Sequence, residues 1–226
     1  MMNLNTFKIQ NMKAIIFDMD GTLINSEPLH AHAASIVLRD LGVNLNLEEC
    51  LKDFYGMTDY DVLKIACPQL SESEILKTID IKNQKLIHLL QSMPKDNLLQ
   101  LMTPGLIPFL DKIKSFNIPM AVVSASEDII VEETISALGI NHYFQFLQGR
   151  SQTHLTKPHP DPYLFAMKKI SSSANETIIF EDSPTGLKAA QTSHAHVIRI
   201  TEFSHTESRA DFTEIKNYNE LMPFLI

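Results

Sequence analysis

The sequence predicts an α/β protein in which a doubly wound parallel sheet is interrupted by an inserted α-helical region. Short apolar runs alternate with segments whose apolar residues recur at helical spacing, a pattern typical of parallel sheets with helices packed against them. Directly after the first run, a long stretch shows helical patterns and no convincing strand. We therefore expect two domains, formed by residues 1–26 with 99–226 and by residues 27–98.

Four apolar runs are predicted as strands, and a shorter run lies between the second and the third. They are rich in β-branched residues and largely continuous, as expected for parallel strands buried on both faces. The runs are residues 14–17, 120–123, 177–180 and 196–199, with residues 146–147 as the short candidate.

Capping signals predict where helices begin between these strands. Thr103 before Pro104 is typical of an N-cap followed by proline at the first helical position, and Asp161 before Pro162 repeats the signal. Ser126 precedes two acidic residues that suit the positive end of a helix dipole.

The inserted region shows two clear helical patterns. One covers residues 29–41 and is expected to end at Gly42. The other covers residues 71–90, where Ser71 and Glu74 have the spacing of a capping box.

Composition excludes several classes of function. The chain has 226 residues, with 44% hydrophobic and 20% charged residues, which is ordinary for a globular protein. Its net charge of −8 gives no general surface for nucleic acid or anionic membranes. An anionic substrate would therefore need a local positive site.

Neither a signal peptide nor a membrane-spanning run is evident. Cys50 and Cys67 lack metal-binding spacing, so we expect both to be reduced and buried, as in a cytoplasmic protein. The acidic balance and the absence of an apolar stripe favour a monomer.

Carboxylates follow two of the predicted strands. Asp18 and Asp20 follow the first strand, and Glu181 and Asp182 follow the third. Ligands bind at the carboxyl ends of parallel strands, and side chains two residues apart point the same way, roughly 6–7 Å apart. That gap can hold one phosphorus atom, although a polar turn is the simpler alternative.

Close carboxylates repel one another unless a cation lies between them. Hard oxygen ligands of this kind suit Mg²⁺, which also contacts substrate phosphate. The sequence therefore predicts a magnesium site at these strand ends.

Two further segments suit an anion. Ser124 ends the second strand before Ala125, so its hydroxyl and nearby backbone N–H groups can form an anion site; a plain N-cap at Ser126 is the alternative. Lys157 lies in a proline-rich loop that can hold one ammonium in place, although a lone loop lysine is usually solvated.

Together these motifs resemble the haloacid dehalogenase superfamily, and specifically its β-phosphoglucomutase-like branch. The resemblance covers nearly the whole chain from Met12 and implies a Rossmann-like core with a helical cap. It is carried by Asp18-x-Asp20-Gly21-Thr22, Ser124, Lys157 with its Pro-x-Pro-Asp, and Glu181-Asp182.

The resemblance implies a role for each acidic residue. Asp18 would be the nucleophile and a metal ligand. Asp20 would be the general acid and base, with its backbone carbonyl on the metal. Asp182, assisted by Glu181, would complete the Mg²⁺ site.

The resemblance also implies that Ser124, Ala125 and Lys157 hold the phosphoryl oxygens. The implied activity is that of a Mg²⁺-dependent phosphatase, which hydrolyses a small-molecule phosphate monoester through an aspartyl-phosphate on Asp18. Sugar phosphates, a nucleotide and 2-phosphoglycolate all fit.

The cap should set specificity. His30 and Lys82 match in position cap residues of the mutases, although His30 can equally be a solvated helix residue. Asp59 stands where the mutases have an arginine, and Tyr55 where they have a lysine, within a loop that includes Gly56. Asp59 would repel the second phosphate of a bisphosphate, which favours a phosphatase.

Two alternatives remain open. One is a sugar-phosphate mutase of the β-phosphoglucomutase type, and the other is a non-catalytic binding or regulatory module on the same fold. Dehalogenase action is disfavoured because halide-releasing relatives lack the acid at Asp20, and no cap lysine is singled out for phosphonatase chemistry.

Overall fold

The computed structural model describes residues 9–54, 57–204, 209 and 211–225. The chain divides into two compact units, Met1–Asn25 with Leu99–Ile226 and Ser26–Leu98. Among the described residues, no helix has both the length and the apolar character needed to cross a membrane.

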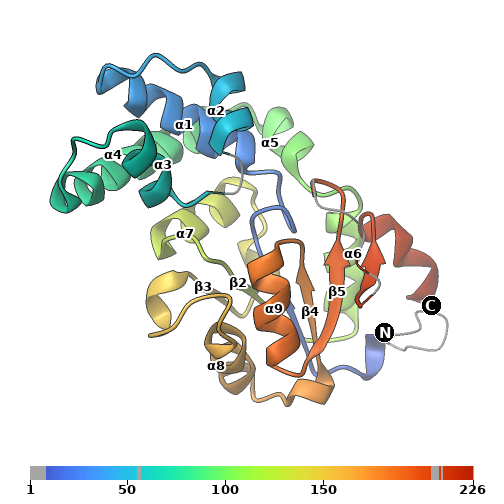
Figure 1. Cartoon of the computed structure of the whole chain (residues 1–226). Helices are drawn as coiled ribbons and strands as arrows, with labels where there is room; N and C mark the ends of the chain where they lie inside the picture. Colours follow the sequence, from blue (N-terminus) through green and yellow to red (C-terminus); the bar gives the residue numbers. More distant parts are fainter. Residues whose placement is uncertain (1–8, 55–56, 205–208, 210, 226) are drawn as a thin grey trace. The chain divides into compact units, whose positions relative to one another are not determined.

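The first unit is built on a six-stranded sheet whose strands are all parallel (Figure 1). The strands are β1 (Ala14–Phe17), β2 (Met120–Val123), β3 (Phe146–Gln148), β4 (Thr177–Glu181), β5 (His196–Ile200) and β6 (Thr213–Ile215). Their order is β3-β2-β1-β4-β5-β6, so the direction of winding reverses between β1 and β4, where open parallel sheets bind ligands. The predicted α/β fold is confirmed.

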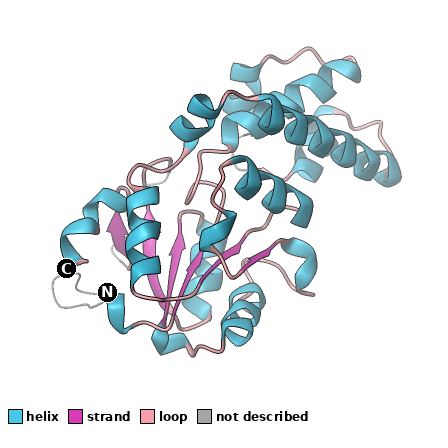
Figure 2. Cartoon of the chain, turned by 180° about the vertical axis from the view of Figure 1, so that it is seen from behind, coloured by secondary structure: helices cyan, strands magenta, loops and turns pink. Residues whose placement is uncertain are grey.

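Helices cover both faces of the sheet. Helices α8 and α9 lie in front of it in Figure 1, and α6 lies in front of it in the reverse view of Figure 2. The helices of this unit are α6 (Leu106–Ser115), α7 (Asp128–Ala137), α8 (Asp161–Ile170) and α9 (Pro184–Thr192).

Each strand residue packs to one face or the other. Ile16 and Ile179 are fully buried in a cluster with residues of α8 and α9. Phe17 and Phe180 point to the opposite face, where their rings stack with centroids 5.2 Å apart and meet Phe109 of α6. Burial on both faces explains why the sequence runs are continuous rather than alternating.

The second unit is helical, as predicted. It contains α1 (Glu27–Asp40), α2 (Leu47–Phe54), α3 (Asp59–Ala66) and α4 (Glu72–Ser92), and α5 (Lys95–Leu101) spans its boundary with the first unit. The predicted capping box is present, since the Ser71 backbone N–H donates to Glu74 Oε2 at 2.8 Å. Cys50 and Cys67 are free and buried in this unit's core.

The helix starts predicted at Thr103 and at Asp161 are wrong. Helix α6 begins at Leu106 with Gly105 as its N-cap, at a φ of +80°, because the Thr103 hydroxyl donates instead to the Thr22 carbonyl at 2.7 Å. Helix α8 begins at Asp161 itself, one residue earlier than the predicted cap implied.

Candidate active site

The loop after β1 carries Asp18 and passes directly against Asp182. The Asp18 backbone N–H donates to the Phe180 carbonyl at 2.9 Å, which ties the end of β1 to β4. Gly21 has a φ of +85°, and a Cβ there would lie 2.2 Å from Asp182 Oδ2. Glycine therefore satisfies both the backbone conformation and the close approach to Asp182.

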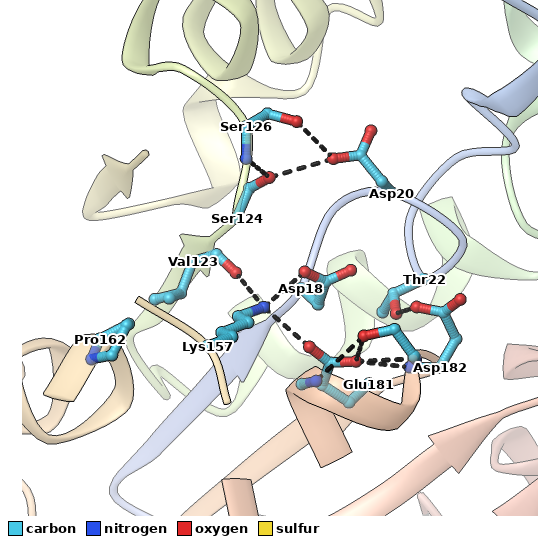
Figure 3. Close-up of polar contacts among 12 residues, drawn as sticks. Asp18, Asp20, Thr22, Val123, Ser124, Ser126, Lys157, Pro162, Glu181 and Asp182 are labelled. Carbon is cyan, nitrogen blue, oxygen red and sulfur yellow. Dashed lines mark hydrogen bonds and ion pairs between the residues drawn. The ribbon is translucent and has the colours of Figure 1, made fainter. Parts of the chain in front are cut away.

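Lys157 connects two of the carboxylates (Figure 3). Its Nζ lies 2.6 Å from Asp18 Oδ1 and 2.7 Å from Glu181 Oε1, and it donates to the Val123 carbonyl at 3.0 Å. Burial lowers the pKa of Lys157, but the charges of Asp18 and Glu181 outweigh burial and hold that pKa above its usual value. The ammonium is thus a fixed positive charge at the strand ends.

Glu181 and Asp182 end β4 and are held differently. Glu181 is fully buried, and its Oε2 accepts from the backbone N–H groups of Asp182 and Ser183 at 2.9 and 3.0 Å. Asp182 accepts one hydrogen bond from the Thr22 hydroxyl at 3.1 Å. Asp182 therefore has fewer hydrogen-bond donors for its charge than Glu181 in the part of the chain that is described.

Asp18, Glu181 and Asp182 each offer a carboxylate oxygen, and these oxygens lie within 4.8 Å of one another. Burial raises the pKa of Asp18 well above its usual range, against the opposing effect of Lys157. Burial, followed by the charge of Glu181, raises the pKa of Asp182 to about 8. One ammonium does not balance three carboxylates, so this cluster fits a metal cation with a preference for hard oxygen ligands.

Asp20 lies on the other side of the site, turned toward β2 (Figure 3). Its Oδ2 accepts from the hydroxyls of Ser124 at 3.0 Å and Ser126 at 2.8 Å. The Ser126 backbone N–H donates to Ser124 Oγ at 3.0 Å, which orders the loop that contains Ala125. The general acid expected from sequence is thereby held by two serines.

The three candidate cap residues form a cluster within the helical unit. Lys82 is buried, at 3% exposed, and its Nζ lies 2.7 Å from His30 Nδ1 and 3.0 Å from Asp59 Oδ2. Tyr55 and Gly56 of the expected specificity loop lie outside the described residues. The charge of Asp59 is therefore paired with Lys82.

Ser126 and Tyr163 were not selected from sequence as site residues. Ser126 was considered as an N-cap, but α7 begins at Asp128 with Glu127 as its cap. Ser126 follows Ser124 by two residues, and this spacing was a usable signal that both hydroxyls lie at the site. Tyr163 donates to Glu181 Oε1 at 2.8 Å, a contact for which helical spacing gave no signal.

Comparison with known proteins points to one family. A family model described as haloacid dehalogenase-like hydrolase matches residues 15–200. The chain is 28% identical over 188 residues to the fructose-1-phosphate phosphatase YqaB of Escherichia coli K12. The aligned region covers 82% of this chain and 95% of that protein.

Solved structures agree in fold. CbbY from Rhodobacter sphaeroides superposes with a TM-score of 0.80 at 22% identity, covering 95% of this chain and 99% of that one. A β-phosphoglucomutase from Clostridium difficile superposes with a TM-score of 0.72 at 21% identity, covering 93% of each chain.

Proposed function

We propose that this chain, which belongs to the haloacid dehalogenase-like hydrolase family, is a Mg²⁺-dependent phosphatase that acts through an aspartyl-phosphate on Asp18. The observation that carries the proposal is the buried contact of Lys157 with both Asp18 and Glu181, beside Asp182. The contact brings together Asp18 as the proposed nucleophile and Lys157 as the proposed phosphate-binding cation. Glu181 and Asp182, the proposed metal-binding carboxylates, lie beside them at the end of the neighbouring parallel strand.

In the first step, a carboxylate oxygen of Asp18 attacks phosphorus and forms a new O–P bond. The bond from phosphorus to the substrate oxygen breaks, and Asp20 gives its proton to the departing alkoxide. A carboxylate nucleophile divides the hydrolysis into two easier steps.

In the second step, Asp20 takes a proton from water, and the water oxygen attacks phosphorus. The O–P bond to Asp18 breaks, so the carboxylate is restored and inorganic phosphate leaves. Asp20 therefore begins protonated and ends protonated in each complete cycle.

Asp18, Asp182 and the backbone carbonyl of Asp20, with Glu181 assisting, would hold the Mg²⁺ ion. A bound Mg²⁺ supplies charge neutralisation for the phosphoryl oxygens. Lys157 and the backbone at Ala125 would bind those oxygens as well.

Ser124 would contribute to the same phosphate site. Its hydroxyl has a single proton, which is donated to Asp20 in this structure. Binding a phosphoryl oxygen would transfer that hydrogen bond from Asp20 to the substrate, while Ser126 would still donate to Asp20.

The substrate we propose is a small phosphorylated metabolite such as a sugar phosphate, in line with the named activity of the Escherichia coli relative. Asp59 stands where the mutases have an arginine, and its charge is paired with Lys82. This position therefore has no cation to bind a second phosphate, which favours hydrolysis over mutase action. We also propose that the protein is cytoplasmic, which its free cysteines support and cell fractionation tests. We further propose that it is a monomer, which light scattering tests.

The first test is turnover of p-nitrophenyl phosphate with Mg²⁺ and with EDTA. We expect EDTA to abolish turnover and excess Mg²⁺ to restore it. Asp18→Asn should lower kcat by at least about a thousandfold, because the covalent route is lost. Asp40→Asn, at an exposed position of α1, is the matched control and should retain full activity.

Absent turnover in the wild type would favour the non-catalytic module. Turnover that survives both EDTA and Asp18→Asn would contradict a metal-dependent route through Asp18. Incubation with β-glucose 1-phosphate and a trace of the bisphosphate separates phosphatase from mutase. We expect phosphate release, and isomerisation without phosphate release would favour the mutase. A panel of phosphorylated metabolites then identifies the substrate class.

A further inference from the structure

Tyr163 of α8 lies against Lys157 and does more than fill the core. It is fully buried, and the centroid of its ring lies 4.9 Å from Lys157 Nζ. Its hydroxyl donates to Glu181 Oε1 at 2.8 Å. The same side chain therefore contacts the ammonium through its ring face and the partner carboxylate through its hydroxyl.

The carboxylate of Glu181 is held rigidly. Its Oε2 accepts from Asp182 and from both the backbone N–H and the hydroxyl of Ser183, at 2.9, 3.0 and 3.1 Å. A Cβ at Gly186 would lie only 1.6 Å from Oε1, so α9 closes the space around the carboxylate. Glu181 is thus a fixed negative charge against which Lys157 is placed.

Two carboxylates compete for one ammonium. All three N–H groups of Lys157 are used, by Asp18, Glu181 and the Val123 carbonyl. A stronger attraction to Glu181 would draw the ammonium away from Asp18. The hydrogen bond that Tyr163 makes to the same Oε1 weakens that attraction, because the oxygen then shares its negative charge between two donors.

We propose that Tyr163 is a positioning residue that keeps the Lys157 ammonium at Asp18, where the phosphoryl group is bound. Its hydroxyl moderates the pull of Glu181, and its ring supports the ammonium from one side. This inference rests on the proposed function, in which Lys157 holds phosphoryl oxygens.

Tyr163→Phe is the deciding variant because it removes only the hydroxyl and keeps the ring. Tyr218→Phe is the matched control, since Tyr218 is also fully buried but its hydroxyl donates to the Thr22 carbonyl at 3.4 Å. For each variant we would measure kcat and KM with p-nitrophenyl phosphate. The dissociation constant of inorganic phosphate would be measured by calorimetry at saturating Mg²⁺.

We expect Tyr163→Phe to lower kcat about tenfold and to weaken phosphate binding several-fold, the scale of one charge-assisted hydrogen bond. The Mg²⁺ concentration for half-maximal activity should change less than about twofold, because Tyr163 acts through Lys157. Tyr218→Phe should leave kcat and phosphate affinity within about twofold. Urea unfolding should show that both variants remain folded under the assay conditions, so a loss of kcat and phosphate affinity confined to Tyr163→Phe separates positioning from packing.

A double-mutant cycle with Lys157→Met tests the connection directly. In the Lys157→Met background, Tyr163→Phe should no longer weaken phosphate binding, since residues that act through one another are not additive. A further several-fold loss in that background would overturn the inference, as would wild-type kcat and phosphate affinity in the single Tyr163→Phe variant.

The two proposals can fail separately. If the wild-type protein binds phosphate but hydrolyses no ester, the proposed function fails, and the phosphate affinities of the variants still decide the role of Tyr163. If the wild type neither turns over ester nor binds phosphate, both proposals are contradicted.

Discussion

Each charged residue at the strand ends is placed by an opposite charge or by specific hydrogen-bond donors. Lys157 is shared between Asp18 and Glu181, while Asp182 has the Thr22 hydroxyl as its donor. Burial raises the pKa values of Asp18 and Asp182, and the charge of the Lys157 ammonium offsets this effect only in part. Without a bound metal, the surroundings of Asp18 and Asp182 therefore disfavour their ionised forms.

This charge imbalance predicts how stability depends on pH. The pKa of Asp182 rises from 3.8 to about 8 on folding, so the folded protein binds that proton more tightly. Its contribution to the unfolding free energy is complete below about pH 4 and is lost as pH rises through about 8. In EDTA, we therefore expect the unfolding free energy measured with urea to lose the contribution of Asp182 between pH 5 and pH 8.

Mg²⁺ should reverse this loss because it binds the ionised carboxylates. At a concentration 100-fold above its dissociation constant it should add about 3 kcal/mol at pH 8, and less at pH 5, where protons compete. Asp182→Asn should remove most of the pH-dependent part. Equal stabilisation by Mg²⁺ at both pH values would contradict a carboxylate metal site with raised pKa values.

Helix α9 positions Glu181 through its first turn. Ser183 is the N-cap and accepts from the Gly186 backbone N–H at 3.1 Å. Gly186 is buried directly beside the Glu181 carboxylate. Glycine ordinarily weakens a helix interior, but here Gly186 leaves the space that the Glu181 carboxylate occupies.

Gly186→Ala should therefore destabilise the protein even though alanine favours helices. Glu181 would have to move, so we expect a loss of about 1–3 kcal/mol of unfolding free energy and a fall in kcat. Thr185→Ala, at the exposed neighbouring position, is the control and should change stability by less than about 0.5 kcal/mol. Urea unfolding checks both, and a stabilised Gly186→Ala protein would refute the tight contact.

Sequence predicted the elements best where burial dictates residue type. The continuous apolar runs of β1, β2 and β4 leave few alternatives, and the capping box of α4 is a local signal. The start of α6 was missed because the Thr103 hydroxyl bonds to Thr22, far away in sequence. Strand β6 was not predicted, because its three residues are too few to produce a periodic pattern.

The order of strands in the whole molecule explains how distant residues reach one site. Asp18 and Asp182 follow strands on the two sides of the point where winding reverses, so carboxylates far apart in sequence meet. The family that the sequence resembles is the one whose model matches residues 15–200, so the predicted resemblance is confirmed.

What sequence could not supply is the set of contacts made across elements. Tyr163 reaches Glu181 from α8, and Ser126 reaches Asp20 from the loop after β2. Ser126 had a local signal in its spacing of two from Ser124, whereas the contact of Tyr163 depends on how elements pack rather than on local pattern. The pairing of Lys82 with Asp59 inside the helical unit is of the same kind.

The central claim is that phosphate is transferred to Asp18, and trapping that intermediate tests it most directly. The protein would be mixed with p-nitrophenyl phosphate and Mg²⁺, quenched in acid within the first turnover, digested and analysed by mass spectrometry. We predict the mass of one phosphoryl group on the peptide that contains Asp18, absent in EDTA and in Asp18→Asn. Full turnover with phosphate found on another residue would contradict the account.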